Sequence, residues 1–416
     1  MLIHSASQLL TLAGGPQRGR ELGRLGIITD GAVLIRDENI AAVGTSEELR
    51  AAFPQEPLLD AGGHVVMPGL VDPHTHAIWV GDRLDEFELL SQGIPYHEIV
   101  NAGGGAFATM RDTCAASLEM LVEQTRPRFV NMFSFGTTTA EVRSGYAGRI
   151  STALRMFQAL LALDREGPLE LAFTFMGSHT IHPDYRGRSG EYAELVRLNM
   201  LDMLKAWWSH HAPYQELPFV DVALGREVFN QEEARRILST AREQGFPLKI
   251  LAADSGFSGS VGIAIEMGAT SVDHLAGVPI QEIRALATND TAMVLLPAAT
   301  FGLGASDYAP AQAILEVGGL LTLASDMNPE TAWCESMQFV IALACRYLHL
   351  TPAQAIAAAT INAAAAIRRA HRIGSLEPGK QADLLILSVS DYRHLGYRFG
   401  TNLAQTVIKK GRVYPV

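Results

Sequence analysis

The feature of this sequence that most constrains its fold is an alternation of short apolar segments with longer helical stretches, which occurs eight times between residues 65 and 371. Each following stretch places Ala, Leu and charged residues at helical spacing. Eight such units predict a (β/α)₈ TIM-type barrel, a fold that typically takes ~250 residues and more with insertions. A doubly wound parallel sheet is the structural alternative, because it is built from the same alternation. The predicted strands are residues 65–71, 136–142, 170–177, 219–224, 247–251, 269–274, 292–297 and 320–325.

Both ends of the chain have a different sequence pattern from the middle, without the alternation of strand-like and helical segments. Short strand-like runs bounded by turn-forming residues fill them, for example residues 31–35 and 383–389. Strands at the two ends have no other sheet to join, so we expect them to pair with one another. The sequence therefore predicts a small composite β-sandwich domain of residues 1–64 and 372–416, beside a barrel domain of residues 65–371.

The overall charge limits the partners of the protein. Its 416 residues include 33 Lys and Arg against 44 Asp and Glu, which gives a formal net charge of −11 with His neutral. An acidic surface repels phosphate groups, and the sequence contains no basic tract. We therefore expect neither nucleic acid nor a membrane surface as a partner. The first apolar segment is also too short and too interrupted to span a membrane.

The cysteines and a pair of tryptophans bear on location and assembly. Cys114, Cys334 and Cys345 are widely spaced and form no C-x-x-C pair, which argues against a disulfide framework or a thiolate metal site and favours a reducing, cytoplasmic environment.

Trp207 and Trp208 form either an exposed patch suited to a homodimer or the core-facing side of a helix.

Polar side chains follow four of the eight predicted strands. In a (β/α)₈ barrel the active site lies at the carboxyl ends of the strands. His74 and His76 follow the first predicted strand, His179 the third, His274 the sixth and Asp326 the eighth. One histidine at a strand end is most often structural, but four equivalent positions together indicate a site.

The His74-x-His76 pair predicts a metal site. Residues two apart on an extended segment point to the same face, so both imidazoles can reach one ion. Asp326 completes a set of three ligands, and His274 is available as a fourth ligand or as a group that orients bound water. Zinc or iron suits these ligands, and the chemistry fits hydrolysis of an amide or a cyclic amide.

Longer motifs carry a family resemblance. MPGLVDPHTH at the first predicted strand, the Ser-Asp after the last one and GSLEPGKQADLLIL near the C-terminus resemble the metal-dependent amidohydrolase superfamily. Within it the sequence resembles the imidazolonepropionases over nearly its whole length. The segments that carry this narrower resemblance are Gly81-Asp82-Arg83, Arg143-Ser144-Gly145-Tyr146, Gly177-Ser178-His179 and Asp326-Met327-Asn328-Pro329.

The resemblance implies a reaction and a set of roles. The reaction is the opening of the 4-imidazolone-5-propanoate ring to N-formimino-L-glutamate in histidine degradation, by attack of water bound to a single zinc or iron ion. The substrate is a small anionic heterocycle, for whose carboxylate Arg83 offers a bidentate fork and Arg143 a second cation. The other substrate contacts that it implies are Tyr146, His179 and Asn328, and the catalytic residues are Asp326, His274 and Asp254.

Among the departures from the pattern of this family, three bear directly on the predicted site. Leu251 stands where a further ligand histidine is expected at the end of strand five. Asp254 occupies a Glu or Gln position and is shorter by one methylene, about 1.5 Å of reach. Glu330 replaces a small glycine and adds negative charge beside an anionic substrate.

These departures leave two alternatives to an imidazolonepropionase-like hydrolase. One is a diverged amidohydrolase that acts on another cyclic amide or heterocycle. The other is a metal-poor relative without catalytic activity. Because the net charge cannot attract an anion, binding of the expected substrate must rest on Arg83, Arg143 and the metal.

Overall fold

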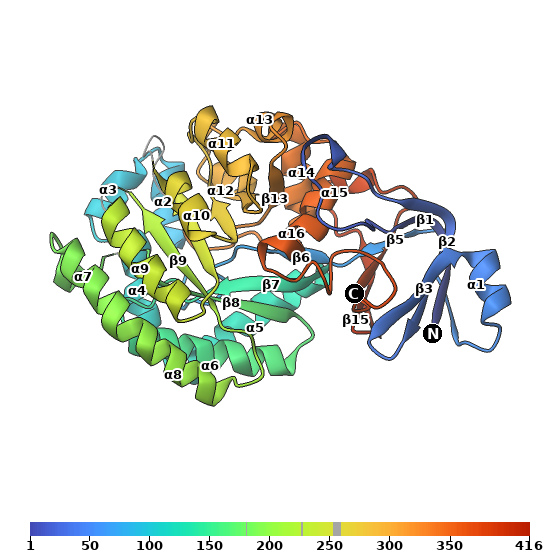
Figure 1. Ribbon diagram of the computed structural model, residues 1–416, viewed down its shortest axis with the longest axis horizontal. Coiled ribbons are helices and arrows are strands. Elements are labelled where there is room, and N and C mark those ends of the chain that lie inside the picture. Colours follow the sequence, from blue (N-terminus) through green and yellow to red (C-terminus); the bar gives the residue numbers. More distant parts are fainter. Residues whose placement is uncertain (180, 226–227, 253–258) are drawn as a thin grey trace.

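The structure is a computed structural model that describes residues 1–179, 181–225, 228–252 and 259–416. It contains two eight-stranded sheets, one of which forms a barrel, while the other is built from both ends of the chain (Figure 1). Within the described part of the chain, no helix is long and apolar enough to cross a membrane.

The barrel sheet consists of eight parallel strands that follow one another in chain order. A doubly wound sheet would reverse its strand order at a switch point, so this order confirms the (β/α)₈ prediction. The strands are β6 (Leu70–Asp72), β7 (Thr137–Arg143), β8 (Glu170–Ser178), β9 (Phe219–Leu224), β10 (Leu248–Ala252), β11 (Ser271–Asp273), β12 (Ala292–Leu295) and β13 (Leu320–Leu323).

The chain beyond β6 and the chain beyond β13 meet and join the two edges of this sheet. Thr75 and Met327 form a parallel bridge. The amide of Asp326 donates to the carbonyl of His74 at 3.1 Å, and the amide of His76 donates to the carbonyl of Met327 at 2.7 Å. The closure of the barrel therefore places the His-x-His segment directly against the segment that carries Asp326.

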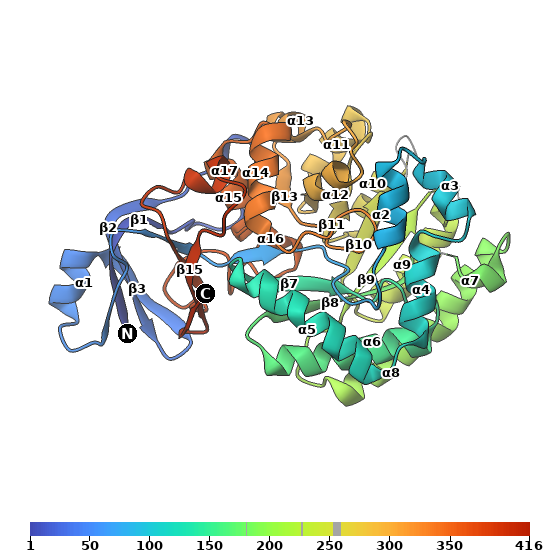
Figure 2. The same cartoon turned by 180° about the vertical axis from the view of Figure 1, so that it is seen from behind.

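Helices surround the barrel (Figure 2). Helix α9 (Gln231–Glu243) illustrates why they form, since Asn230 and Glu233 make a capping box at its start and its buried residues recur at helical spacing. The others in the barrel region are α2 (Leu84–Ser91), α3 (Tyr96–Asn101), α4 (Ala106–Ala115), α5 (Leu118–Ser134), α6 (Ile150–Glu166), α7 (Ser189–Leu195), α8 (Leu201–His211), α10 (Ser260–Met267), α11 (Ile280–Ala287), α12 (Pro297–Gly302), α13 (Ala311–Glu316), α14 (Met337–Tyr347), α15 (Pro352–Ala358) and α16 (Ile361–Ala366), with shorter turns at Gly19–Glu21 and Pro183–Tyr185 and a π-helical turn at Val196–Met200.

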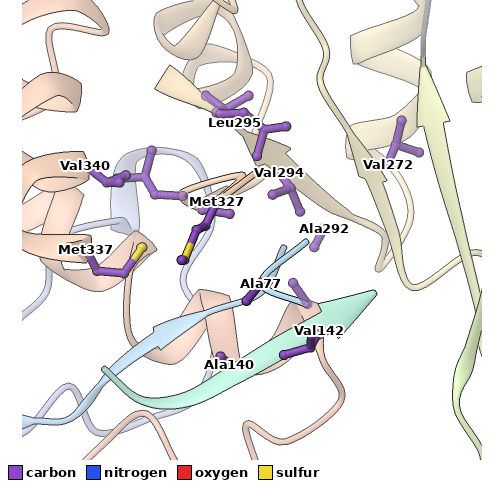
Figure 3. Close-up of a cluster of buried hydrophobic side chains, with 14 of the residues drawn as sticks. Ala77, Ala140, Val142, Val272, Ala292, Val294, Leu295, Met327, Met337 and Val340 are labelled. Atoms are coloured by element: carbon purple, nitrogen blue, oxygen red, sulfur yellow. The ribbon is translucent and has the colours of Figure 1, made fainter. Parts of the chain in front are cut away.

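The hydrophobic core continues from the barrel strands to the segments that close the barrel. Figure 3 shows Ala140 and Val142 of β7 near Ala77 and Met327, which lie just beyond His76 and Asp326 in the sequence. All four side chains are fully buried. This packing holds the backbone on both sides of the polar cluster in place.

The second sheet combines strands from both termini, as the sequence predicted. Its order is β16-β15-β14-β5-β1-β2-β3, with β4 paired to β1. Helix α1 (Ser46–Ala52) packs on it, and α17 (His394–Tyr397) lies beside α14. The strands are β1 (Leu2–Leu10), β2 (Ile27–Arg36), β3 (Asn39–Thr45), β4 (Leu58–Asp60), β5 (Val65–Pro68), β14 (Leu384–Leu387), β15 (Ala404–Lys409) and β16 (Arg412–Pro415).

The prediction of a single barrel strand over residues 65–71 was wrong. Residues 65–68 pair within the terminal sheet, and the barrel begins at Leu70. The chain passes from one sheet to the other at Gly69, where a Cβ atom would collide with the side chain of Thr138. The limits of the two domains stay a prediction.

The two tryptophans in α8 have different environments. Trp208 is fully buried and meets the rings of Phe157 and Phe173 edge-on. Trp207 is half-buried and stacks on His211. Trp208 therefore belongs to the core, and the homodimer stays a prediction.

Candidate active site

Three side chains meet at the carboxyl end of the barrel with metal-ligand spacing. His74, His76 and Asp326 each offer one ligand atom, and these atoms all lie within 4.8 Å of one another. The Nε2 atoms of His74 and His76 are 3.3 and 3.5 Å from Oδ1 of Asp326. These are three of the four residues predicted as ligands from the sequence, and the fourth, His274, is not part of this group.

The environment of His74 fixes which of its nitrogens faces the cluster. Its Nδ1 atom lies 2.6 Å from Oδ2 of Asp273, which leaves Nε2 directed at Asp326. Burial and the charge of Arg143 oppose protonation of this ring, but hydrogen bonds to Asp273 and Asp326 outweigh them and raise the pKa of His74 to about 9. The His74 ring therefore favours its protonated, positively charged form, which shows that its surroundings stabilise positive charge at the place where a metal ion would bind.

His76 provides the second imidazole of this group. Its ring is held next to Gly145, where an added Cβ would lie 2.7 Å from Nδ1. Burial lowers the pKa of His76 well below its ordinary value, so this imidazole is neutral and suited to ligation. Its Nδ1 atom is buried without a hydrogen-bond partner among the described residues.

Asp326 is ionised and held in an uncommon backbone conformation. Although burial opposes its charge, the hydrogen bond with His74 and the positive charge of that ring lower the pKa of Asp326 to about 2. Its φ angle is +52° and that of His274 is +86°, in the left-handed region that residues with a Cβ seldom adopt. Strain of this kind persists where the surrounding structure fixes it, which is common at functional sites.

These observations fit a divalent metal ion. The donor set is two imidazoles and one carboxylate, a combination that catalytic zinc sites use with an open position for water. Asp273 orients His74 in the way that carboxylates orient metal-bound histidines. The site also places the ionised carboxylate of Asp326 and the neutral imidazole of His76 together in a buried position, a pair of donors that suits a cation.

Arg143 lies inside the barrel and is linked to this group through Asp273, which contacts both Arg143 and His74. It is fully buried on β7, and its guanidinium contacts Glu141 at 3.1 Å, Asp273 at 2.6 Å and also Asp221. Because these three carboxylates occupy all sides of the guanidinium, a direct contact with the substrate, as the sequence analysis expected, is not what this geometry supports. Arg143 instead supports Asp273 from behind.

Arg143 belongs to a buried ionic network that was not predicted from the sequence. Glu141 also accepts a hydrogen bond from the amide of Thr75 at 3.2 Å, between the two histidines. Lys249 on β10 donates to the carbonyl of Pro73 at 3.0 Å and lies 3.8 Å from Glu141. Charged residues inside predicted strands were the available signal, since a fully buried charge requires a partner.

His179, His274 and Asn328 occupy different positions around the cluster. His179 is buried at the end of β8, with Nε2 3.0 Å from Oδ2 of Asp221. His274 follows β11 outside the three-residue group, and burial lowers its pKa. The amide of Asn328 donates to the carbonyl of Asp326 at 2.6 Å and accepts from two backbone amides, so it shapes the loop beside Asp326.

Arg83 and Tyr146 lie together on another side of the site. Both are buried, and the charge of Arg83 acts on the Tyr146 hydroxyl. The ring of Tyr146 is 5.9 Å from that of His76, centre to centre. The Nη1 atom of Arg83 donates to Glu86 at 3.0 Å and to the carbonyl of Gly105. Its Nε and Nη2 atoms have no hydrogen-bond partner among the described residues, so they remain available to an acceptor.

Of the two positions where the sequence departs from the family on strand five and just beyond it, the structure describes position 251. Leu251 is half-buried on β10 and shares a face with Lys249, so it points to the barrel interior but offers no ligand atom. Asp254 lies outside the described residues.

Comparisons with known proteins point in the same direction. Residues 227–414 match the amidohydrolase family, and residues 31–55 match the bacterial imidazolonepropionase-like composite domain. The imidazolonepropionase of Herpetosiphon aurantiacus is 44% identical over 99% of this chain and 96% of its own, and that of Chloroflexus aggregans 43% over 99% and 98%. Among solved structures, Escherichia coli guanine deaminase superposes with a TM-score of 0.72 at 16% identity over 100% of this chain and 99% of its own. A zinc-bound adenosine deaminase from Xanthomonas campestris gives 0.68 at 18% over 100% and 92%.

A parallel barrel with two histidines beyond its first strand and an aspartate beyond its last defines a metal-dependent amidohydrolase, an enzyme that acts on C–N bonds. The full-length similarity to curated relatives narrows this class. The chain belongs to the imidazolonepropionase family.

Proposed function

We propose that this chain hydrolyses 4-imidazolone-5-propanoate to N-formimino-L-glutamate in histidine degradation, with one zinc or iron ion held by His74, His76 and Asp326. The observation that carries the proposal is the position of Arg83 beside Tyr146, whose ring lies next to His76. A buried guanidinium with two nitrogen atoms that lack a hydrogen-bond partner among the described residues suits the carboxylate tail of the substrate. The curated relatives with this activity in their name support the same assignment.

The reaction adds water to the carbonyl carbon of the ring, breaks the adjacent C–N bond and gives a proton to the ring nitrogen. The chemistry that a divalent ion supplies when bound is activation of a water molecule and polarisation of a carbonyl group. Asp326 is ionised at neutral pH, so its carboxylate can take the proton of the attacking water and pass it to the leaving nitrogen.

The remaining residues bind and orient the substrate. Arg83 binds the carboxylate tail, and Tyr146 lies against the ring. We assign His179 to a contact with the substrate, His274 to a fourth ligand position or to the orientation of the attacking water, and Asn328 to the loop that positions Asp326. We also place the enzyme in the cytoplasm, where its three unpaired cysteines remain reduced.

The test is loss of imidazolone absorbance with purified, metal-loaded protein. Asp326→Asn should abolish turnover, because it removes both a ligand and the proton acceptor. Asp290→Asn, which changes a fully exposed carboxylate, is the matched control and should retain activity. The proposal is overturned if the metal-loaded protein leaves the absorbance unchanged.

A diverged amidohydrolase acting on another cyclic amide, or deaminating a heterocycle, is the second candidate. Two residues favour this candidate. Leu251 stands where the family has a ligand histidine, and Glu330 lies near Arg83. A panel of lactams, hydantoins and aminated heterocycles tests this alternative. It fails if imidazolonepropanoate is the sole substrate turned over.

A further inference from the structure

Glu330 faces the open side of the Arg83 guanidinium. Its Oε1 atom lies 3.8 Å from Nη2 of Arg83, which is within ion-pair distance but beyond hydrogen-bond distance. Glu86 holds the other terminal nitrogen, Nη1, at 3.0 Å and also accepts hydrogen bonds from the amide of Gly105. Arg83 therefore has one tightly bound carboxylate and a second, looser one beside Nη2, which has no hydrogen-bond partner among the residues that the structure describes.

The second contact of Glu330 is with Tyr146. Burial, the charge of Glu330 and a hydrogen bond to its carboxylate together raise the pKa of the Tyr146 hydroxyl well above its ordinary value. The backbone amide of Glu330 donates to Oδ1 of Asn328 at 2.8 Å, which anchors the residue to the loop after Asp326. Its side chain is only 15% exposed. The carboxylate is thus held between the two residues that we assign to substrate binding.

The charge balance follows from these contacts. Arg83 carries one positive charge, and Glu86 and Glu330 carry two negative ones within ion-pair distance of it. An anionic tail that approaches Nε and Nη2 therefore meets a guanidinium that is already neutralised, and a like charge across from it. An uncharged tail of the same shape meets no such repulsion.

We infer that Glu330 is a specificity-determining residue that competes with the substrate carboxylate for Arg83 and so reduces the preference of the site for an anionic tail. This inference rests on the proposed function, because it takes Arg83 as the group that receives that tail. It predicts that the wild-type protein distinguishes an acid from its amide only weakly.

The experiment uses two ligands whose aromatic ring is not hydrolysed, imidazole-4-propanoate and its amide. Calorimetry with the metal-loaded protein gives the ratio of their dissociation constants for the wild type and for Glu330→Gln. The variant should raise the preference for the acid about tenfold, because it removes one like charge at short range. The KM for imidazolonepropanoate should fall by a similar factor, with kcat nearly unchanged.

Glu335→Gln is the matched control, since it removes the same charge from the same loop. Glu335 bonds to Asn131 and Trp333 and not to Arg83, so the acid-to-amide ratio should stay at the wild-type value. Glu330→Gly is the second variant, and thermal unfolding selects whichever of the two is folded. An unchanged ratio in the folded variant, or an equal change in the control, overturns the inference.

The two readouts separate this inference from the proposed function. If no variant turns over imidazolonepropanoate but the acid-to-amide ratio shifts, the proposed function fails and the role of Glu330 stands. If turnover is present and the ratio does not shift, the proposed function stands and the role of Glu330 is refuted.

Discussion

Asp273 links His74 to the ionic network inside the barrel. Its Oδ2 atom lies 2.6 Å from Nδ1 of His74 and 2.6 Å from Nη2 of Arg143. One carboxylate thus fixes the orientation of a ligand imidazole and is itself fixed by a buried guanidinium. We therefore expect metal binding at the predicted site to depend on Asp273 as well as on His74, His76 and Asp326.

The first prediction concerns that link. Asp273→Asn should weaken metal affinity by about 10- to 100-fold, because the amide no longer holds His74 with a charged acceptor. Competition with a chromogenic chelator measures the affinity. Asp290→Asn is the control at an exposed position and should match the wild type. Equal affinities in both variants would show that Asp273 does not support the ligand.

The second prediction concerns the position that lacks a ligand. Leu251 lies on β10 opposite Ala223 of β9 and Asp273 of β11. Leu251→His should raise metal affinity about tenfold or more, because it adds a nitrogen donor on the barrel-facing side of the strand. Leu251→Asn controls for the loss of the apolar side chain. If neither metal content nor turnover rises, three ligands were already sufficient.

The third prediction concerns Gly145. Gly145→Ala should reduce metal affinity, since its Cβ would lie 2.7 Å from Nδ1 of His76 and must displace the ring. Overpacking of this kind costs about 1 to 3 kcal/mol. Gly262→Ala in α10 adds the same atom where nothing lies within 4 Å, so metal affinity should not change there. Identical chelator curves for the two variants would refute the steric argument.

The fourth prediction concerns Glu170 at the start of β8. Its carboxylate contacts Arg369 at 3.2 Å and Lys409 of the terminal sheet at 3.0 Å, and it also pairs with Arg372. Burial opposes ionisation, but Lys409, Arg369 and Arg372 hold the pKa of Glu170 below its ordinary value of 4.5. Glu170→Gln should lower the free energy of unfolding at pH 7 by about 3 kcal/mol.

The pH dependence of that effect has a definite sign. A carboxyl whose folded pKa is depressed stabilises the fold above its unfolded pKa, and this contribution is lost as pH falls toward the folded pKa. The difference between wild type and Glu170→Gln should therefore be constant at pH 7 and 6 and shrink below pH 4.5. Urea unfolding at each pH measures it. Glu166→Gln, at an exposed pair with Arg126, should change little, and a pH-independent difference for Glu170 would contradict the ionic explanation.

The barrel and the His74-x-His76 pair could both be predicted from the sequence. Eight strand-and-helix units are periodic, and His74 and His76 lie two apart on one extended segment, so both features are local. The split at Gly69 was missed because residues 65–71 form one apolar run, and only pairing with two different sheets divides it.

The buried ionic network around Arg143 could not be predicted from local sequence patterns. Arg143 and Glu141 are two apart on β7 and share the barrel-facing side, but only the register of the neighbouring strands shows that Asp221 and Asp273 meet them there. A sequence presents Arg143 as a free cation. The three-dimensional arrangement shows a buried charge that is fully paired.

The central claim is that one metal ion at His74, His76 and Asp326 makes this chain a hydrolase of imidazolonepropanoate. The most direct measurement is a titration of chelator-treated protein with zinc or iron, with loss of imidazolone absorbance as the readout. We predict that activity rises linearly and reaches a plateau at one equivalent of metal per chain, and that His76→Ala shows no rise. Activity that is absent at every metal concentration, or that survives unchanged in His76→Ala, would contradict the account.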